Sequence, residues 1–448
     1  MKPKAISSGQ FELFQANFNQ ILNLDHELCQ LADAINWNRF DAELTDCYSE
    51  EMGRPGIAIR LMVGLHYLKH AFNESDESVV ARWVENPYWQ YFCGFEYLQH
   101  ECPIHPTSMV KWRQRVGDER LEMLLAETIT VALDYKQVSS QQLGKITVDT
   151  TVQEKAIAFP TDARLCTKML LRLVNLSKRR DVVLRQTYIR KAPAILRQQG
   201  RYGHARQFKR ARKCTRQLKT LLGRVVRDIR RKAEVIDEEL ETFLVRADQL
   251  LSQQRDSKNK LYSIDAPEVE CISKGKAHKR YEFGCKVSIA TTNMGDWVVG
   301  VQALHGNPYD GHTLADAVLQ SERVTGKQVK AVFVDQGYKG HNYTGDGEVH
   351  ITGRRGKAKA TSTLRKRKKR RAAIEPKIGH LKSDHRMGRN FLKGASGDRM
   401  NALLAGMGAN IRKLLAAFWR ALGQWQAYYC EHAFLPTWPP SPRLAVAA

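Results

Sequence analysis

The amino-acid sequence predicts an α/β protein in which a mixed-sheet domain carries a basic helical insertion and follows an all-α N-terminal region. Three observations support this prediction. The first 120 residues have helical periodicity, strand-like alternation begins at Gly144, and a long block of like charge interrupts the strands. At 448 residues the chain exceeds what one hydrophobic core usually serves, so two to four structural units are expected.

The N-terminal helices, expected over residues 1–120, end in a short basic helix. Thr107 or Ser108 is the predicted N-cap of "MVKWRQRVG", which stops at Gly117. Short capped helices of which the last is basic resemble a helix-turn-helix layout, whose recognition helix enters the major groove. A helical cluster that only packs is the alternative. On the first interpretation, the basic side chains of this helix are candidate DNA contacts: Lys111, Arg113 and Arg115.

The strand pattern follows a linker helix predicted over residues 121–143. "GKITVDTTVQEKAIAF" predicts two strands, and the charged segment 166–257 predicts a helical insertion. Strands resume with "RYEFGCKVSIATTN" and "WVVGVQALHG". A capped helix, "DGHTLADAVLQSERV", and the strand "AVFV" come next, and a short strand is expected near Val349. The mixed-sheet domain is therefore expected over residues 144–165 and 258–398.

A C-terminal helical segment is expected over residues 399–448. Its apolar residues recur at helical spacing, which favours packing in its own domain over a partner site. The stripe consists of Leu403, Met407, Ile411, Leu414, Phe418, Leu422 and Trp425.

Positive charge is concentrated in two blocks. The formal net charge is +24, yet from Arg164 to Lys232 there are 23 Lys and Arg against two acidic residues, and from Arg354 to Arg371 eleven against none. Blocks of one sign repel themselves unless a polyanion neutralises them, and nucleic acid is the commonest polyanion. An anionic membrane is the competing partner. It is disfavoured because the first block lacks the Trp, Phe and Leu face of an interfacial helix.

Signals for other compartments and chemistries are missing from the sequence. No apolar stretch approaches the roughly 20 residues that span a bilayer, and the N-terminus has no apolar signal core. Nine scattered cysteines without a Cys-x-x-Cys pair fit reduced thiols rather than disulfides or a zinc site. No Gly-x4-Gly-Lys phosphate loop is present. The expectation is a soluble cytoplasmic protein without a membrane partner.

Three carboxylates stand out by their position. Asp149 lies inside a strand, where neither a turn nor a cap explains it. Asp335 directly follows a buried strand, and Glu375 shares one helical face with Arg371 and Lys382. The ordinary alternatives are a turn-forming Asp335 and an i, i+4 pair of Arg371 with Glu375. However, two strands and a helix that each carry an acid, arriving in this order, are what a mixed sheet needs to bring three carboxylates to the same end of adjacent elements.

Three clustered carboxylates can hold two hard divalent cations, which activate an attacking oxygen and stabilise a leaving one at a phosphate. Mg²⁺ suits oxygen ligands, and Mn²⁺ is the alternative. Lys382 or Arg371 can then hold the phosphate or neutralise charge that develops on it.

Four segments resemble those of bacterial DDE transposases of the insertion sequence 5 family: "VDTT", "HGNPYDGHTL", "VFVDQGYKGH" and "RAAIEPKIGHLKSDHRMGRNFLKG". That family's motif around the last acid is Tyr, two residues, Arg, three residues, Glu, six residues, Lys. Arg371, Glu375 and Lys382 match it, whereas Lys368 takes the place of the Tyr. The resemblance implies a ribonuclease H-like catalytic domain whose metal-binding triad is Asp149, Asp335 and Glu375. It also implies that the N-terminal helices help to bind the element's ends.

The expected activity is therefore binding of the inverted terminal ends of a mobile element, phosphodiester cleavage and strand transfer into target DNA. A DNA-binding regulator and a nuclease of the same fold without joining activity are the alternatives. Because the enzyme must bind two element ends, a homodimer on double-stranded DNA is expected. The expected location is the bacterial nucleoid in the cytoplasm. Asp310 is read as an N-cap, or alternatively as support for the acids. Further expected DNA contacts are Arg354, Arg355, Lys368, Lys369, Arg370 and His380.

Overall fold

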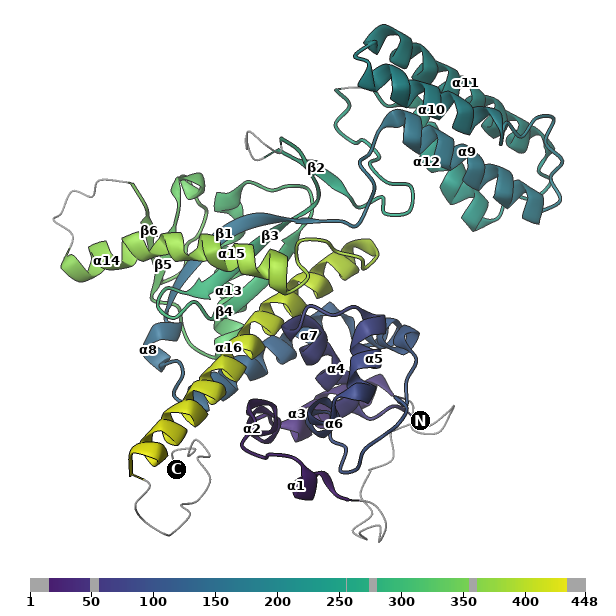
Figure 1. Ribbon diagram of the computed structural model, residues 1–448. Coiled ribbons are helices and arrows are strands. Elements are labelled where there is room, and N and C mark those ends of the chain that lie inside the picture. Colours follow the sequence, from purple (N-terminus) through teal and green to yellow (C-terminus); the bar gives the residue numbers. More distant parts are fainter. Residues whose placement is uncertain (1–15, 49–55, 255, 274–279, 354–360, 433–448) are drawn as a thin grey trace. The chain divides into compact units, whose positions relative to one another are not determined.

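The computed structural model describes residues 16–48, 56–254, 256–273, 280–353 and 361–432, with backbone alone for 422–432. The chain forms two compact units (Figure 1). The large unit comprises Met1–Glu154 and Cys285–Ala448, and the inserted unit comprises Lys155–Gly284. None of the described helices is both long and apolar enough to cross a membrane.

The large unit begins with helices. α5 starts with a capping box between Ser75 and Ser78, and α6 starts with Pro87 directly after its N-cap, Asn86. The helices are α1 (Phe18–Ile21), α2 (Glu27–Ala34), α3 (Trp37–Leu44), the 3₁₀ turn η1 (Thr45–Cys47), α4 (Ile59–Ala71), α5 (Asp76–Glu85), α6 (Pro87–Phe92), α7 (Pro106–Asp134) and α8 (Ser140–Leu143).

The basic helix differs from its prediction. His105 is the N-cap of α7, because its side chain accepts a hydrogen bond from the Thr107 N–H and Pro106 fills the first helical position. The helical backbone is interrupted at Gly117, as predicted, because that glycine adopts φ 77° and ψ 172°. A second helical stretch continues directly from this kink to Asp134, and both stretches are labelled α7.

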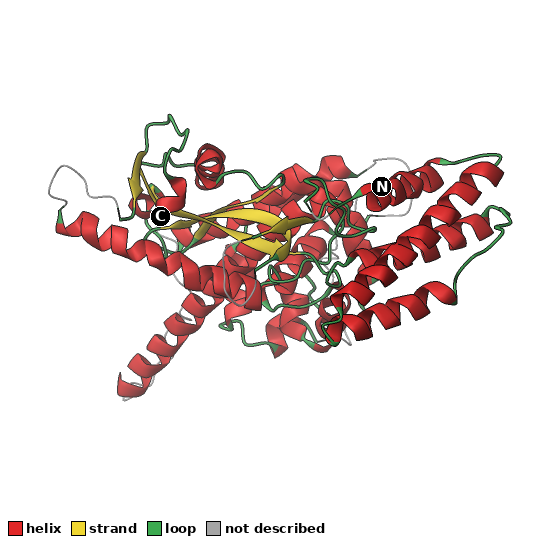
Figure 2. Cartoon of the chain, turned by 90° about the horizontal axis from the view of Figure 1, so that it is seen from above, coloured by secondary structure: helices red, strands yellow, loops and turns green. Residues whose placement is uncertain are grey.

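The strands form one six-stranded mixed sheet (Figure 2). The strand order is β2-β3-β1-β5-β6, and β4 also pairs with β3. β1 and β6 run parallel to β5, whereas β4 runs antiparallel to β3. The predicted pair of strands after Gly144 is a single strand, β1. The strands are β1 (Lys145–Glu154), β2 (Glu270–Ile272), β3 (Glu282–Thr292), β4 (Val298–Leu304), β5 (Ala331–Val334) and β6 (Glu348–Ile351).

Backbone hydrogen bonds at both ends of β1 show that it runs antiparallel to β3. Near the start of β1, the Asn293 N–H donates to the Lys145 carbonyl. At its other end, the Lys155 N–H donates to the Phe283 carbonyl. The start of β1 therefore lies beside the end of β3, as an antiparallel pair requires.

Four further helices of the large unit come after β4 in the sequence, and three of them pack against strands. α13 and α16 pack against β4, and α15 packs against β1. Three 3₁₀ turns lie next to these elements. η2 (Asp310–Thr313) precedes α13, η3 (Gln336–Tyr338) follows β5, and η4 (Arg371–Ala373) precedes α15. The helices are α13 (Leu314–Thr325), α14 (Ser362–Arg370), α15 (Ile374–Asp384) and α16 (Gly394–His432).

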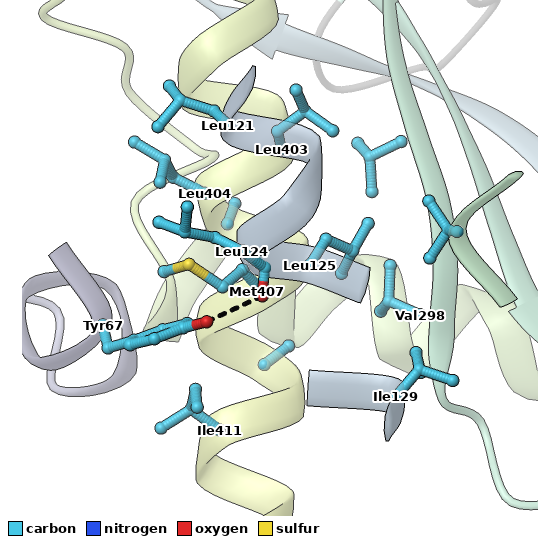
Figure 3. Packing of buried hydrophobic residues seen from close by; sticks show 14 of the residues in the cluster. Tyr67, Leu121, Leu124, Leu125, Ile129, Val298, Leu403, Leu404, Met407 and Ile411 are labelled. Atoms are coloured by element: carbon cyan, nitrogen blue, oxygen red, sulfur yellow. Dashed lines mark hydrogen bonds between the residues drawn. The ribbon is translucent and has the colours of Figure 1, made fainter. Parts of the chain in front are cut away.

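α16 connects the N-terminal helices with the sheet, because it packs against α4, α7 and β4. Figure 3 shows Leu403, Leu404, Met407 and Ile411 of α16 among apolar residues of α7 and beside Val298 of β4. The predicted apolar stripe is buried from Leu403 to Phe418, which confirms its packing role over this range. The side chains of Leu422 and Trp425 lie outside the described residues.

Gly408 lets α16 approach α4 closely. A Cβ at this position would lie 2.6 Å from the backbone carbon and oxygen of His70, and a backbone group cannot rotate away. In contrast, a Cβ on Gly379 of α15 would meet nothing within 4 Å.

We predict that Gly408→Ala destabilises the protein. Alanine favours a helix over glycine by about 1 kcal/mol. Overpacking against a fixed backbone costs about 1–3 kcal/mol, so the clash outweighs that gain. Thermal unfolding of both variants checks this, with Gly379→Ala expected to unfold at or above the wild-type temperature. A Gly408→Ala protein as stable as the wild type would contradict the close approach.

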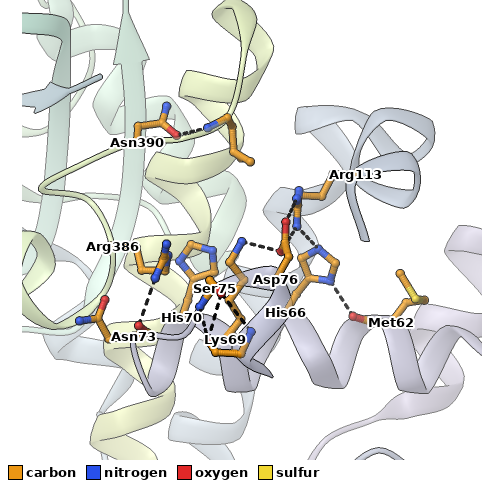
Figure 4. A network of polar contacts seen from close by, with 12 residues as sticks. Met62, His66, Lys69, His70, Asn73, Ser75, Asp76, Arg113, Arg386 and Asn390 are labelled. Carbon is orange, nitrogen blue, oxygen red and sulfur yellow. Dashed lines mark hydrogen bonds and ion pairs between the residues drawn. The ribbon is translucent and has the colours of Figure 1, made fainter. Parts of the chain in front are cut away.

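A buried polar network joins α4, α5 and α7 (Figure 4). Asp76 pairs with Arg113 at 2.6 Å and with Lys69 at 2.7 Å, and Arg113 also donates to Nε2 of His66. Arg113 is 2% exposed. The prediction that it contacts DNA is therefore wrong: its guanidinium is a structural partner of Asp76, and removing it would leave a buried carboxylate unpaired.

Two further buried histidines tie α4 to the segment after α15. Nδ1 of His385 contacts the His70 carbonyl at 2.8 Å, and Nδ1 of His70 contacts the His385 carbonyl at 3.4 Å. Burial lowers the pKa of His385 to about 4 and that of His66 to about 3, and it also lowers the pKa of His70. All three imidazoles are therefore neutral in the folded protein at pH 7.

We predict that the protein loses stability between pH 7 and pH 5. In the unfolded chain a histidine takes up a proton below pH 6.5, whereas buried His385 does so only near pH 4. The unfolded state thus binds more protons, and each such histidine costs about 2 kcal/mol at pH 5. Urea unfolding of His385→Asn at both pH values should show a smaller pH difference than the wild type. The exposed-site control, His380→Gln, should retain the full difference.

The inserted unit is a bundle of four helices with a hydrophobic core of its own (Figure 1). α9 (Asp162–Arg179), α10 (Lys191–His204) and α11 (Phe208–Lys232) contact one another, and α12 (Glu238–Ser252) contacts α9 and α11. Apart from these helices, the unit contains β2 and the first residues of β3, which pair with each other.

Candidate active site

The parallel pairing of β1 with β5 brings the first two carboxylates together. The register aligns Lys145 with Ala331 and Thr147 with Phe333. Two residues further in the same register, Asp149 falls beside Asp335. β5 ends at Val334, and the Asp335 side chain caps the following turn by accepting a hydrogen bond from the Gly337 N–H at 2.8 Å.

Arg371 gathers all three predicted carboxylates. Its guanidinium lies 2.8 Å from Asp149, 3.6 Å from Asp335 and 3.3 Å from Glu375. Acids that are 40 to 226 positions apart in the sequence therefore meet around one side chain. The cluster is open to solvent at Glu375 and Asp335, whose side chains are 65% and 40% exposed, whereas the Asp149 side chain is 16% exposed.

Contacts to the turn between β3 and β4 hold the helical part of the cluster on the sheet. Arg370 pairs with Asp296 at 3.1 Å and donates to the Asn293 carbonyl. The Asn293 amide in turn donates to the Arg367 carbonyl and to the Thr147 hydroxyl of β1. Arg370 and Asn293 thus fix the turn that carries Arg371 relative to the strand that carries Asp149.

Asp310 and Lys286 form a charged pair next to the cluster. Asp310 accepts hydrogen bonds from Lys286 at 3.0 Å and from the hydroxyl of Thr150, the neighbour of Asp149, at 3.1 Å. A Cβ on Gly337 would lie 3.0 Å from an oxygen of Asp335 and 3.5 Å from one of Asp310, so both carboxylates flank that glycine. The predicted N-cap role of Asp310 is wrong, since its side chain makes no capping hydrogen bond.

Tyr338 interacts electrostatically with the cluster and was not singled out by the sequence analysis. It is fully buried. Burial raises the pKa of its hydroxyl above the usual value, and the negative charges of Asp149, Asp310 and Asp335 raise it further. The hydroxyl therefore stays protonated and is available as a hydrogen-bond donor.

The predicted DNA contacts lie on several elements. Lys111 and Arg115 are exposed on α7, and the Arg115 guanidinium lies 5.1 Å from the centre of the Tyr48 ring. Lys369 is exposed on α14, Lys368 is half-buried, and His380 pairs with Asp384 at 2.8 Å. Lys382 is half-buried on α15, about two turns beyond Glu375. Arg354 and Arg355 lie outside the described residues.

A second group of possible metal ligands lies elsewhere in the large unit. Cys285, His305 and Asp398 each place one ligand atom within 4.8 Å of the others. Asp398 also accepts a hydrogen bond from Asn390 at 2.6 Å. This mixture of thiol, imidazole and carboxylate differs from the three carboxylates around Arg371, which are the oxygen donors that hard cations prefer.

We predict that Asp310→Ala destabilises the large unit. Lys286 is 8% exposed and would lose its carboxylate partner, which should cost about 1–3 kcal/mol because the pair is only partly buried. Adding Lys286→Met removes the stranded charge and should restore much of that loss. Denaturant unfolding of the two single variants and the double variant measures the coupling. If the two substitutions changed the free energy of unfolding additively, the interaction between Asp310 and Lys286 would contribute nothing to stability.

Comparison with known proteins assigns the class. A family model described as "Transposase domain (DUF772)" matches residues 16–115, and one described as "Transposase DDE domain" matches residues 256–411. A Rhizobium meliloti protein described as "Uncharacterized protein ORF8 in nfe locus" is 49% identical over 208 residues, which is 46% of this chain and 100% of that protein. No solved structure matches.

The chain belongs to the DDE transposases, enzymes that cleave and transfer DNA with the help of a divalent metal. DNA is therefore its partner, and the mixed sheet is that of a ribonuclease H-like domain. The matched range 256–411 contains Asp335 and Glu375 but not Asp149. The pairing of β1 with β5 places Asp149 beside Asp335.

Proposed function

We propose that this enzyme is a transposase of the insertion sequence 5 family that binds the inverted terminal ends of its element, cleaves phosphodiester bonds there and joins the freed 3′ ends to target DNA. One observation carries the proposal: the Arg371 guanidinium contacts the carboxylates of Asp149, Asp335 and Glu375. In this proposal, those three residues are the metal ligands.

The donor set fits a divalent cation. Three carboxylates against one guanidinium leave an excess of negative charge in a partly buried place, which a hard cation neutralises. Oxygen donors favour Mg²⁺, with Mn²⁺ as a substitute, and the number of carboxylates suits two ions. When bound, such ions activate the attacking oxygen and stabilise the leaving one.

The chain's own residues position the acids and the phosphate. The paired strands hold Asp149 and Asp335, and α15 supplies Glu375 from the more exposed side. Arg371 and Lys382 are proposed to bind the scissile phosphate, because guanidinium and ammonium groups make charge-assisted hydrogen bonds to phosphate oxygens. Proposed contacts to the DNA backbone are Lys111, Arg115, Lys368, Lys369, Arg370 and His380.

Two further features of the proposal follow from the substrate. An element has two ends, so we propose a homodimer on double-stranded DNA. Because that DNA is bacterial, we place the enzyme at the nucleoid in the cytoplasm. The N-terminal helices, including the exposed Lys111 and Arg115 of α7, are proposed to recognise the ends.

We predict that Asp149→Ala, Asp335→Ala and Glu375→Ala each abolish Mg²⁺-dependent nicking of DNA that contains an element end. Residues that merely support metal ligands typically contribute 10–100-fold, so loss of a ligand should exceed about 100-fold. A cation at 100 times its Kd stabilises the folded state by about 2.7 kcal/mol, so Mg²⁺ should raise the unfolding temperature of the wild type more than that of the variants. Near wild-type nicking by any variant would refute the role of that acid.

A strand-transfer assay separates the alternatives. A nuclease of the same fold would nick end DNA without joining it to a target. A regulator would bind end DNA but would show no metal-dependent nicking. Joined products that require all three acids would exclude both.

A further inference from the structure

The inserted unit presents a row of cations along α11. One face of this 25-residue helix is buried in the bundle core. The opposite face carries cations spaced by three, four or eight residues, which places them within about 80° of arc. All five are exposed: Lys209, Lys213, Arg216, Arg224 and Arg227. We call them the α11 stripe.

Among the described residues, no acidic side chain forms an ion pair with any of the five cations of the α11 stripe. Several acids of this unit pair with other cations. Asp237 and Glu239 pair with Arg180, and Asp248 pairs with Arg230. Asp228, the sole acid of α11, is 8% exposed and accepts a hydrogen bond from the Arg185 N–H at 2.7 Å.

The geometry of the α11 stripe fits a long, regular polyanion. Lys209 and Arg227 are 18 residues apart, which corresponds to about 27 Å of helix. Duplex DNA carries one negative charge per about 1.7 Å of its axis, so several phosphates lie within that length. A lipid surface would need an apolar face beside the cations, but the apolar face of α11 is buried in the bundle.

We propose that the α11 stripe binds the phosphate backbone of duplex DNA without regard to sequence. The inference rests on the proposed function, since it takes the enzyme's DNA as the partner. It assigns to the inserted unit an interaction surface whose residues are separate from the carboxylate cluster and from α7. Cations along one face of a helix contact phosphates and read no bases.

The test compares two full-length triple variants with the same loss of charge. The stripe variant is Lys213→Gln, Arg216→Gln and Arg224→Gln. The control is Lys168→Gln, Arg172→Gln and Arg230→Gln, whose wild-type side chains pair with Asp265 and Asp248 in the same unit. Affinity for a long duplex without element ends is measured over a range of salt concentrations.

The stripe variant should bind at least about tenfold more weakly at low salt. Its slope of log affinity against log salt should fall by about 2 to 3, since each lost phosphate contact reduces the slope by about 0.9. The control should keep the wild-type slope. Equal slopes for the stripe variant and the wild type would overturn the inference, as would a stripe-dependent affinity for anionic phosphatidylglycerol vesicles combined with unchanged DNA binding.

Failure of this inference can be told apart from failure of the proposed function. Asp149→Ala should keep the wild-type salt slope on the same duplex while it loses nicking of end DNA. If the stripe variant keeps the slope and Asp149→Ala still loses nicking, only the DNA-binding role of the α11 stripe is wrong. If Asp149→Ala nicks normally, the proposed function is wrong, whatever the stripe variant does.

Discussion

The parallel register between β1 and β5 is the constraint on which the candidate site depends. It aligns Thr147 with Phe333, so that Asp149 and Asp335 emerge side by side from two neighbouring strands. A slip of one residue would turn every following side chain of β1 to the opposite face of the sheet. Asp149 would then point away from Arg371, to which it now lies 2.8 Å away. Buried Ile146 and Val148 resist such a slip, because they would have to exchange places with more polar neighbours.

Around this pair, the enzyme uses charged side chains as structural ties as well as for chemistry. Arg371 holds three carboxylates whose mutual repulsion would otherwise separate them. Arg370 fastens the same turn to the loop between β3 and β4, and Lys286 holds Asp310 beside Thr150. The basic block in front of Glu375 therefore includes at least two residues with intramolecular partners. Counting cations in such a block overstates how many are available to DNA.

The N-terminal helices and the sheet share one core through α16. Gly408 permits backbone contact with α4, and the residues around Met407 fill the space between α7 and β4 (Figure 3). Buried His70 and His385 add reciprocal contacts between α4 and the segment after α15. A helical region that matches one transposase model and strands β4 to β6, which match another, are thus packed together in the large unit. The inserted unit, in contrast, has a core of its own.

The sequence alone predicted most element types, the three acids that the structure brings together at Arg371, and the charge that indicates a nucleic-acid partner, because periodicity, strand-borne carboxylates and single-sign blocks are local patterns. It could not distinguish a DNA-facing arginine from a structural one: Arg113 and Arg115 are two residues apart, yet one is buried against Asp76 and the other is exposed. It also missed Lys286 and Tyr338 and misassigned Asp310, since their roles arise from contacts between distant strands and turns. Only the tertiary structure decided these points, because the burial and the partners of a side chain depend on which segments meet in space. Two residues that are close in sequence can therefore differ in both.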